Sequence, residues 1–311
     1  NMGMLEAKNI GKDTNYWLIR PGINNICFEQ FKRDSVVAIG WDRIGNINSD
    51  TIVELEKIKY IVAHEYADLL QEKKGTRERR RKISDIASKI YRFLYEIKIG
   101  DIVICPGNDS VLIGKIQGKV YISDGKYKVS DSKDSDEYIG NLNKVRKVEW
   151  INEIKRENLE PNIKLELRVV HGLSQINRMQ VISEINRAIY SFYTYNNETH
   201  SIYRIKNQED IEFVKYAKFI ECINAVYKRI GETDQISEHN LYIKSNINSP
   251  GPIDIFGTPD LVYRITERVE IILKKGNIEN ASESDENWIS EMQDKYNDNY
   301  DDYVFPSGGS V

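Results

Sequence analysis

Two apolar strands joined by a short polar loop constrain the fold of this chain more than any other part of its 311 residues. A helical pattern ends just before Gly100-Asp101, and this turn leads into a first strand at Ile102–Cys105. The loop Pro106–Asp109 then leads into a second strand at Val111–Ile116. The sequence therefore predicts a hairpin in the middle of a small β-barrel.

The loop of this hairpin presents a side chain suited to reading a nucleobase. Pro106 fixes φ and Gly107 tolerates positive φ, so Asn108 can hold its amide towards the mouth of the barrel. An amide both donates and accepts hydrogen bonds, which suits the edge of a base. These residues are also the ordinary turn residues of a hairpin that has no binding role.

Three further predicted strands of this region each carry a tryptophan. Trp17 lies in the first strand, Trp41 ends the strand 35–41, and Trp150 ends the strand 145–150, which closes the barrel. Trp17 and Trp41 can be core anchors, the usual place of tryptophan. They can also form a flat wall on which a planar ligand stacks.

A run of positive charge lies within the helical part of this region. Residues 51–99 space their apolar side chains as two helices would, so the barrel is expected to carry inserted helices. Between the two apolar stripes, Lys73–Lys82 holds seven bases and one acid. A solvated helix face explains such a run. The seven cations also repel one another, and an anionic partner would relieve that repulsion.

The second half of the chain predicts another domain of mixed helices and strands. A strand at Leu165–Val170 opens it, and the remaining elements are helices near 179–189, 209–230 and 260–275 and strands at 241–247 and 253–256. From residue 277 the chain is acidic with interspersed aromatic residues. This composition predicts disorder, or a segment that docks its aromatic side chains on a partner or on the basic front of the chain.

Charge and cysteine usage bound the class of protein. Residues 1–170 carry 30 Lys and Arg against 26 Asp and Glu, whereas residues 171–311 carry 14 against 22, so a polyanion would meet the first part. Three scattered cysteines without CxxC spacing predict neither disulfides nor a cysteine metal site. No apolar run approaches the ~20 residues of a membrane helix and the chain does not show the charged-then-apolar pattern of a secretory signal, so we expect a cytoplasmic protein with no membrane contact.

Few motifs of known chemistry occur. The chain lacks GxxxxGK[ST], GxGxxG and HExxH, and its four histidines are far apart in the sequence. Two triplets, Glu96-Ile-Lys98 and Glu153-Ile-Lys155, match the Glu-x-Lys pattern in which a carboxylate holds Mg²⁺ and a lysine polarises the phosphate. A divergent Mg²⁺-dependent endonuclease therefore stays an alternative, although no catalytic residue, metal ligand or cofactor is predicted.

Several short motifs, in their order and spacing, resemble a known superfamily. They are Tyr16-Trp-Leu-Ile-Arg20, Val37-Ala-Ile-Gly-Trp41, Ile97 to Asn108, Leu112-Ile-Gly-Lys-Ile116 and Val148-Glu-Trp150. Together they resemble the EVE domains of the PUA-like superfamily and the N-terminal module of Mrr-type modification-dependent restriction proteins, over about residues 14–155. This sequence departs from EVE domains at Pro106-Gly107, where an aromatic residue and a histidine or serine are usual.

The resemblance implies a fold and a set of contacts. The fold class would be α+β, with an N-terminal PUA-like (EVE-like) small β-barrel and inserted helices, followed by a second α+β domain. The implied base pocket consists of Trp17, Trp41, Asn108 and Trp150. Phosphates would be contacted by Arg20, which matches a basic position of the family, and we add the basic run: Arg77, Arg79, Arg80, Arg81 and Lys82.

The sequence thus predicts a nucleic-acid-binding protein that reads a modified, flipped base, in double-stranded DNA by preference, in a bacterial restriction or anti-phage defence setting. A protein-interaction or small-ligand sensor is a further alternative, with homo-oligomer or effector contacts through residues 161–311. The expected organisation is a leader at 1–13, the nucleic-acid-binding domain at 14–160, the second domain at 161–276 and the acidic tail at 277–311.

Overall fold

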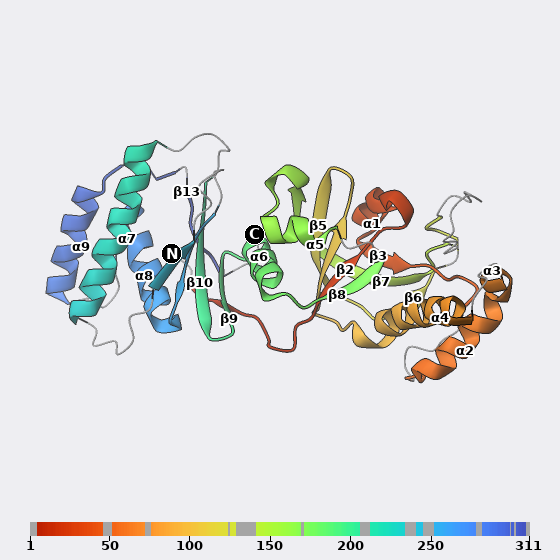
Figure 1. Cartoon of the computed structure of the whole chain (residues 1–311). Helices are drawn as coiled ribbons and strands as arrows, with labels where there is room; N and C mark the ends of the chain where they lie inside the picture. Colours follow the sequence, from red (N-terminus) through yellow and green to blue (C-terminus); the bar gives the residue numbers. More distant parts are fainter. Residues whose placement is uncertain are drawn as a thin grey trace. The chain divides into compact units, whose positions relative to one another are not determined.

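The chain folds into two compact units of α+β structure (Figure 1). The computed structural model describes residues 5–45, 52–71, 76–123, 125–128, 141–168, 171–205, 212–233, 241–244, 252–277, 282–298, 300–301 and 303–308. Asp13–Asn186 form one unit, which we call the half-barrel unit. Asn1–Lys12 and Arg187–Val311 form the other, which we call the sheet–helix unit. Within the described residues, no helix combines the length and the apolar character needed to cross a membrane.

A curled mixed sheet organises the half-barrel unit. Its strands follow the order β3-β7-β5-β4-β2-β8, with β6 paired to β7. Their bounds are Tyr16–Ile19 for β2, Val36–Ile39 for β3, Ile102–Pro106 for β4, Ser110–Ile116 for β5, Tyr121–Ile122 for β6, Lys144–Lys155 for β7 and Leu173–Ile176 for β8. The predicted hairpin is therefore present as β4 and β5, and it lies in the middle of the sheet.

The turn before β4 holds two neighbouring strands of the sheet together. Gly100 has a φ of 96°, which favours glycine, and its N–H donates to the carbonyl of Ile116. The buried carboxylate of Asp101 accepts from the backbone N–H groups of Asn15 (3.1 Å) and Lys98 (2.9 Å). This single side chain thus ties the start of β2 to the start of β4, because a buried carboxylate must have its lone pairs satisfied.

Helices inserted between β3 and β4 cover the sheet. They are α2 (Leu55–Glu65), the short α3 (Ala67–Gln71) and α4 (Thr76–Tyr91), followed by a π-helical turn at Arg92–Glu96. The two helices predicted within residues 51–99 correspond to α2 and α4. Their apolar faces join the core of the sheet, where Ile58, Val62, Ile86 and Ile90 are buried.

The sheet–helix unit has a sheet that is antiparallel except for the pairing of its first strand, with helices on one face (Figure 1). The strand order is β1-β9-β10-β12-β11, and β13 also pairs with β10. The strands are Lys8–Asn9 (β1), Phe192–Tyr195 (β9), Glu198–Ile205 (β10), Leu241–Lys244 (β11), Ile253–Gly257 (β12) and Tyr303–Val304 (β13). The helices are α7 (Phe213–Thr233), α8 (Pro259–Leu273) and α9 (Glu283–Lys295).

The division between the units falls later than residue 160. The predicted strand at 165–170 is wrong for its first part, because α5 (Pro161–Glu166) is helical and residues 169–170 lie outside the described residues. The strand predicted at 145–150 extends further, because residues 151–155 continue β7. The strand β8 pairs with β2, which holds α5 and the first part of α6 (Met179–Ile189) in the half-barrel unit.

The chain ends are part of the sheet–helix unit. The described residues of the acidic tail form α9 and β13, and the buried Met292, Tyr296, Tyr300, Tyr303 and Phe305 join the core of this unit. The described tail aromatics therefore pack in the core of the chain's second unit, and not on the basic front that the sequence offered as a docking place. In the segment expected as a leader, β1 pairs in parallel with β9, so Lys8 and Asn9 extend the sheet.

Candidate nucleic-acid interface

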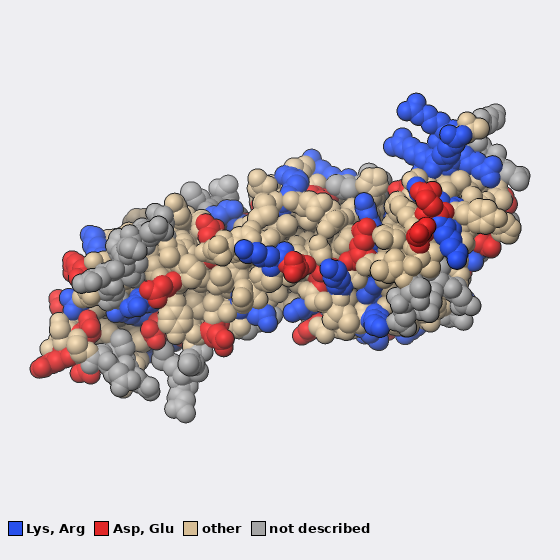
Figure 2. All heavy atoms as spheres, turned by 90° about the horizontal axis from the view of Figure 1, so that it is seen from below, with Lys and Arg blue, Asp and Glu red and all other residues tan. Residues whose placement is uncertain are grey.

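The largest exposed group of cations in the predicted set lies on the first turns of α4. We call this group the α4 cations: Arg77, Arg79, Arg80, Arg81 and Lys82. Arg77, Arg80 and Arg81 are exposed, whereas Arg79 and Lys82 are half-buried. Figure 2 shows blue side chains projecting together from the part of the half-barrel unit that carries α4. None of the four arginines forms an ion pair with a residue that the structure describes.

The local electrostatics of α4 oppose this placement. The N-terminus of a helix carries about half a unit of positive charge, so cations in the first turns are unfavourable by roughly 0.3–1 kcal/mol each at low salt. Like charges three or four residues apart add a further few tenths of a kcal/mol per pair. Only Glu78 supplies an acid in the first turn. An anion bound beside α4 would reverse the sign of both terms.

The fold explains why these side chains remain in solvent. The buried positions of α4 are Ile86, Ala87 and Ile90, all in the second half of the helix. Lys89, also in that half, pairs with Asp85 at 2.7 Å. The first two turns therefore have little apolar surface to bury, and their cations point away from the core.

Trp17 is a core residue, which corrects its predicted place in a base pocket. Its side chain is 1% exposed, and its indole N–H donates to Asp101 at 2.9 Å. A ring in this position offers no open face on which a base could stack. The alternative of a core anchor, left open by the sequence, is therefore the one that the structure supports.

Trp41 and Trp150 also serve the core. Trp41 is 7% exposed, and the ammonium of Lys89 lies 5.8 Å from its ring centroid. Trp150 is half-buried, and its indole N–H donates to the carbonyl of Phe31 at 3.1 Å. The ring packs on Gly114, where an added Cβ would lie 2.6 Å from Trp150 Cε3. Both tryptophans therefore pack with the core of the half-barrel unit.

Strand register separates Asn108 from Trp41. Trp41 follows β3, whose last pair is Ile39 with Lys144, at one end of β7. Asn108 precedes the pair Ser110 with Lys155, at the other end of β7. The intervening strand rises roughly 30–35 Å. The predicted pocket of Trp17, Trp41, Asn108 and Trp150 is therefore not assembled, because two of its members lie at opposite ends of the half-barrel.

The β4–β5 loop forms a separate polar group at its own end of the sheet. Asn108 is exposed, and its amide oxygen accepts from the amide of Asn25 at 3.1 Å. Arg156 donates to the carbonyl of Gly107 at 2.9 Å. Gly107 is required there because an added Cβ would lie 2.8 Å from the ring of Phe28.

Arg20 joins this end of the sheet. Its guanidinium donates to the carbonyl of Leu167 at 2.6 Å. Burial, and then the positive charge of Arg156, lower the pKa of Arg20. The structure thus brings Arg20 and Asn108 to one end of the sheet, together with Asn25 and Arg156. No sequence motif marks these two residues.

Two further cations of the half-barrel unit are buried in β7. The ammonium of Lys144 donates to the carbonyl of Trp41 at 2.9 Å and to the amide oxygen of Asn143 at 3.1 Å. The guanidinium of Arg146 donates to the carbonyls of Phe93, Leu94 and Gly118 at 2.9–3.1 Å. Burial lowers the pKa of Lys144 to about 8 and that of Arg146 to about 10.

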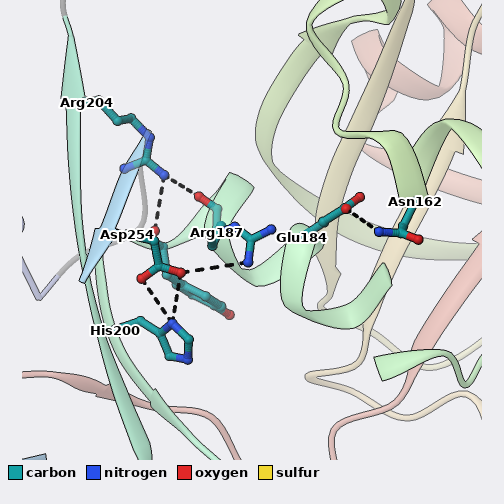
Figure 3. Close-up of polar contacts among 7 residues, drawn as sticks. Asn162, Glu184, Arg187, His200, Arg204 and Asp254 are labelled. Atoms are coloured by element: carbon teal, nitrogen blue, oxygen red, sulfur yellow. Dashed lines mark hydrogen bonds and ion pairs between the residues drawn. The ribbon is translucent and has the colours of Figure 1, made fainter. Parts of the chain in front are cut away.

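The sheet–helix unit contains a buried charge cluster that the sequence did not reveal (Figure 3). His200 Nδ1 lies 3.1 Å from both carboxylate oxygens of Asp254, and Arg187 Nη1 lies 3.8 Å from one of them. Arg204 donates to the carbonyls of Arg187 and Tyr190. These residues are distant in sequence, and only the pairing of β10 with β12 brings His200 and Asp254 together.

In the half-barrel unit, Figure 3 also shows a carboxylate that caps a helix. Glu184 is buried, and it accepts from the amide of Asn162 at 2.6 Å and from the backbone N–H of Ile163 at 2.8 Å. Both donors lie in the first turn of α5. The contact has the chemistry of an N-cap supplied from another helix.

The two Glu-x-Lys triplets have ordinary ion-pair partners. Glu153 pairs with Lys32 at 2.6 Å and accepts from Ser110 at 2.7 Å. Glu96 lies 3.6 Å from Arg92. Among the described residues, no three His, Cys, Asp or Glu side chains are grouped as a metal site requires. The carboxylates of both triplets are therefore engaged by neighbouring side chains of the half-barrel unit.

Comparison with known proteins gives one finding. A family model with the description "Domain of unknown function (DUF8426)" matches residues 17–174. The match begins in β2 and ends in β8, two strands that pair through Trp17 and Gln175 and through Leu18 and Ser174. A comparison with the curated proteins gives no match.

Proposed function

Since the chain belongs to the family described as a domain of unknown function (DUF8426), we propose its function from its own geometry: the half-barrel unit binds nucleic acid through the α4 cations. One observation carries the proposal. Four arginines extend from the positive end of a helix, and none of them has an acidic partner in the described part of the chain. Such a surface favours a polyanion such as a phosphate backbone.

Two features support nucleic acid over other polyanions. The half-barrel unit has a curled mixed sheet, and short motifs within residues 14–155 resemble the PUA-like superfamily, so we take the fold of this unit to be PUA-like. Arginine also binds phosphate with a planar, bidentate geometry that lysine lacks, and four of the five α4 cations are arginines.

Base recognition enters the proposal only through the β4–β5 loop. Trp17 and Trp41 are core residues, so a base held between them is no longer proposed. Asn108 is exposed and its amide oxygen is engaged by Asn25, so its amide nitrogen is the group that could donate to a base. A hydrogen bond from this group to a base edge would be worth about 1–3 kcal/mol of discrimination.

The salt dependence of binding tests the proposal. The equilibrium dissociation constant of the full chain for a 20-base-pair DNA duplex is measured between about 50 and 200 mM salt. For wild type, we expect the logarithm of the association constant, the reciprocal of this dissociation constant, to fall with log salt at a slope of about −0.9 for each phosphate neutralised. The variant Arg77→Gln/Arg80→Gln/Arg81→Gln should lose roughly 2–3 from this slope and bind more weakly at every salt concentration.

A matched variant controls for net charge. Lys98→Gln/Lys147→Gln/Lys155→Gln removes three exposed cations of the same unit that lie outside α4. This control should keep most of the wild-type slope. Equal slopes for the two triple variants would show that α4 is not the interface. Repeating the measurement with Asn108→Ala, on modified and unmodified duplexes, decides whether the loop distinguishes a base.

A further inference from the structure

Four rings stack across the sheet of the sheet–helix unit. Tyr193 and His200 have centroids 4.6 Å apart and lie 5° from parallel. His200 and Phe256 are 5.1 Å apart at 11°, and Phe256 and Tyr242 are 5.4 Å apart at 28°. The rings come from β9, β10, β12 and β11, where each residue is paired directly with the next. We call this row the ring ladder.

The ring ladder is buried at one end and open at the other. Tyr193 and His200 are buried, Phe256 is half-buried, and Tyr242 is 52% exposed. Tyr242 belongs to β11, the last strand in the sheet order. Because an aromatic ring can stack on both of its faces and Tyr242 is the exposed end of the ladder, a further planar group could continue the stack there.

The inner rings hold the outer ring in place. His200 is fixed by its contacts with both oxygens of Asp254, and this carboxylate lies within 3.8 Å of Arg187 (Figure 3). A stacked partner positioned in this way limits the rotation of Phe256, which in turn supports Tyr242. A rigid aromatic platform binds planar ligands with less loss of side-chain entropy than a freely rotating ring does.

A cation lies beside the open end of the ladder. Lys244 is exposed and lies two residues after Tyr242 on β11, so both side chains are on the same face of the sheet, roughly 6.6 Å apart along the strand. Asp254 is paired across from Lys244 in the sheet, but its carboxylate is in contact with His200 and Arg187. The ammonium of Lys244 is therefore placed to meet an anion next to the ring.

We propose that Tyr242 and Lys244 form a second nucleic-acid contact, in which an unpaired base stacks on Tyr242 and a neighbouring phosphate meets Lys244. The proposal rests on the nucleic-acid binding proposed above, and it adds the class of ligand, a single strand. In a duplex the base faces are occupied by neighbouring bases, whereas single strands present them to aromatic side chains.

The test must distinguish a stacked base from another ligand of β11, an added β-strand. Ile243 is 53% exposed on the opposite face of β11, so an added β-strand could also pair with this edge. The ring ladder favours a base, because it aligns the outer ring with three others and sets a cation beside it. Strand pairing needs neither feature.

The experiment compares single-stranded and duplex ligands on the full chain. Affinities are measured for a 12-nucleotide oligothymidylate and for a 20-base-pair duplex. Tyr242→Ala should weaken single-strand binding by roughly five- to a hundredfold and leave duplex binding unchanged. Tyr242→Phe keeps the ring and should bind like wild type, and Lys244→Gln should reduce the salt slope for the single strand by about 0.7.

Control variants make the outcomes distinct. Phe213→Ala removes another ring of the same unit that is 80% exposed but lies outside the ladder, and it should have no effect. The inference is overturned if wild type does not bind the single strand, if Tyr242→Ala binds it like wild type, or if Tyr242→Ala instead changes the oligomeric state. If the triple α4 variant binds duplex like wild type while Tyr242→Ala loses the single strand, the proposed function fails and this inference stands.

Discussion

Two sets of cations in the half-barrel unit have opposite surroundings. Lys144 and Arg146 in β7 are buried, and each donates at least three hydrogen bonds to backbone or amide oxygens. The arginines among the α4 cations extend into solvent and have no ion-pair partner among the described residues. The comparison shows that burial with satisfied donors marks a cation as structural. Exposure at the positive end of a helix marks it as available to a ligand.

Substitution of a buried cation should have the largest effect on the free energy of unfolding. Arg146→Met leaves the carbonyls of Phe93, Leu94 and Gly118 without their donor, and the free energy of unfolding should fall by roughly 3–5 kcal/mol. Urea denaturation measures this change. Arg77→Met, on the exposed side, should stay within about 0.5 kcal/mol of wild type. Equal losses for the two variants would remove the distinction between the sets.

The pH dependence of stability tests the effect of burial on Lys144. Burial lowers its pKa from 10.5 to about 8, so between these values the unfolded chain holds a proton that the folded chain has released. The free energy of unfolding therefore rises with pH between these two values. The stabilisation that Lys144 gains by losing its proton is complete above pH 10.5 and is lost as pH falls through 8. Urea denaturation between pH 7 and 10 should show wild type gaining stability relative to Lys144→Met as pH rises.

A control on the same strand isolates that effect. Lys147 is exposed on β7, so Lys147→Met should show no such change relative to wild type. A constant difference between wild type and Lys144→Met over this pH range would mean that the ammonium stays charged in the fold.

Removing the exposed arginines of α4 should have the smallest effect on stability, and this effect should be a gain. Arg77→Gln/Arg80→Gln/Arg81→Gln removes repulsion near the N-terminus of α4, so at low salt the free energy of unfolding should rise by a few tenths of a kcal/mol. Thermal unfolding in low salt detects the gain, and high salt should remove it. A loss of more than about 1 kcal/mol would give these arginines a structural role.

Local sequence patterns identified the elements near the candidate interface. The Gly100-Asp101 turn, the β4–β5 hairpin and the helices at α2 and α4 follow from turn residues and from apolar periodicity, which depend on neighbours along the chain. The cationic run was also visible, because charge is a property of composition. The strand predicted at 165–170 failed where α5 forms, since short apolar runs fit a helix as well as a strand.

Roles that depend on distant partners could not be predicted in this way. The sequence offers Trp17 as a surface on which a base could stack. Its indole N–H instead donates a hydrogen bond to Asp101, 84 residues away. Trp41 and Asn108 were candidates for one pocket until the register of β3, β5 and β7 placed them at opposite ends of the sheet. The cluster of Asp254, His200 and Arg187 had no sequence signal at all.

The sequence by itself determined an α+β protein with a central hairpin and a concentrated run of positive charge, because periodicity, turn chemistry and charge are local properties. Only the tertiary structure decided which side chains are buried and which remain in solvent. Strand register and long-range hydrogen bonds join residues that no local pattern connects. The ends of the chain illustrate this, because β1 and the aromatic residues of the tail both complete the sheet–helix unit.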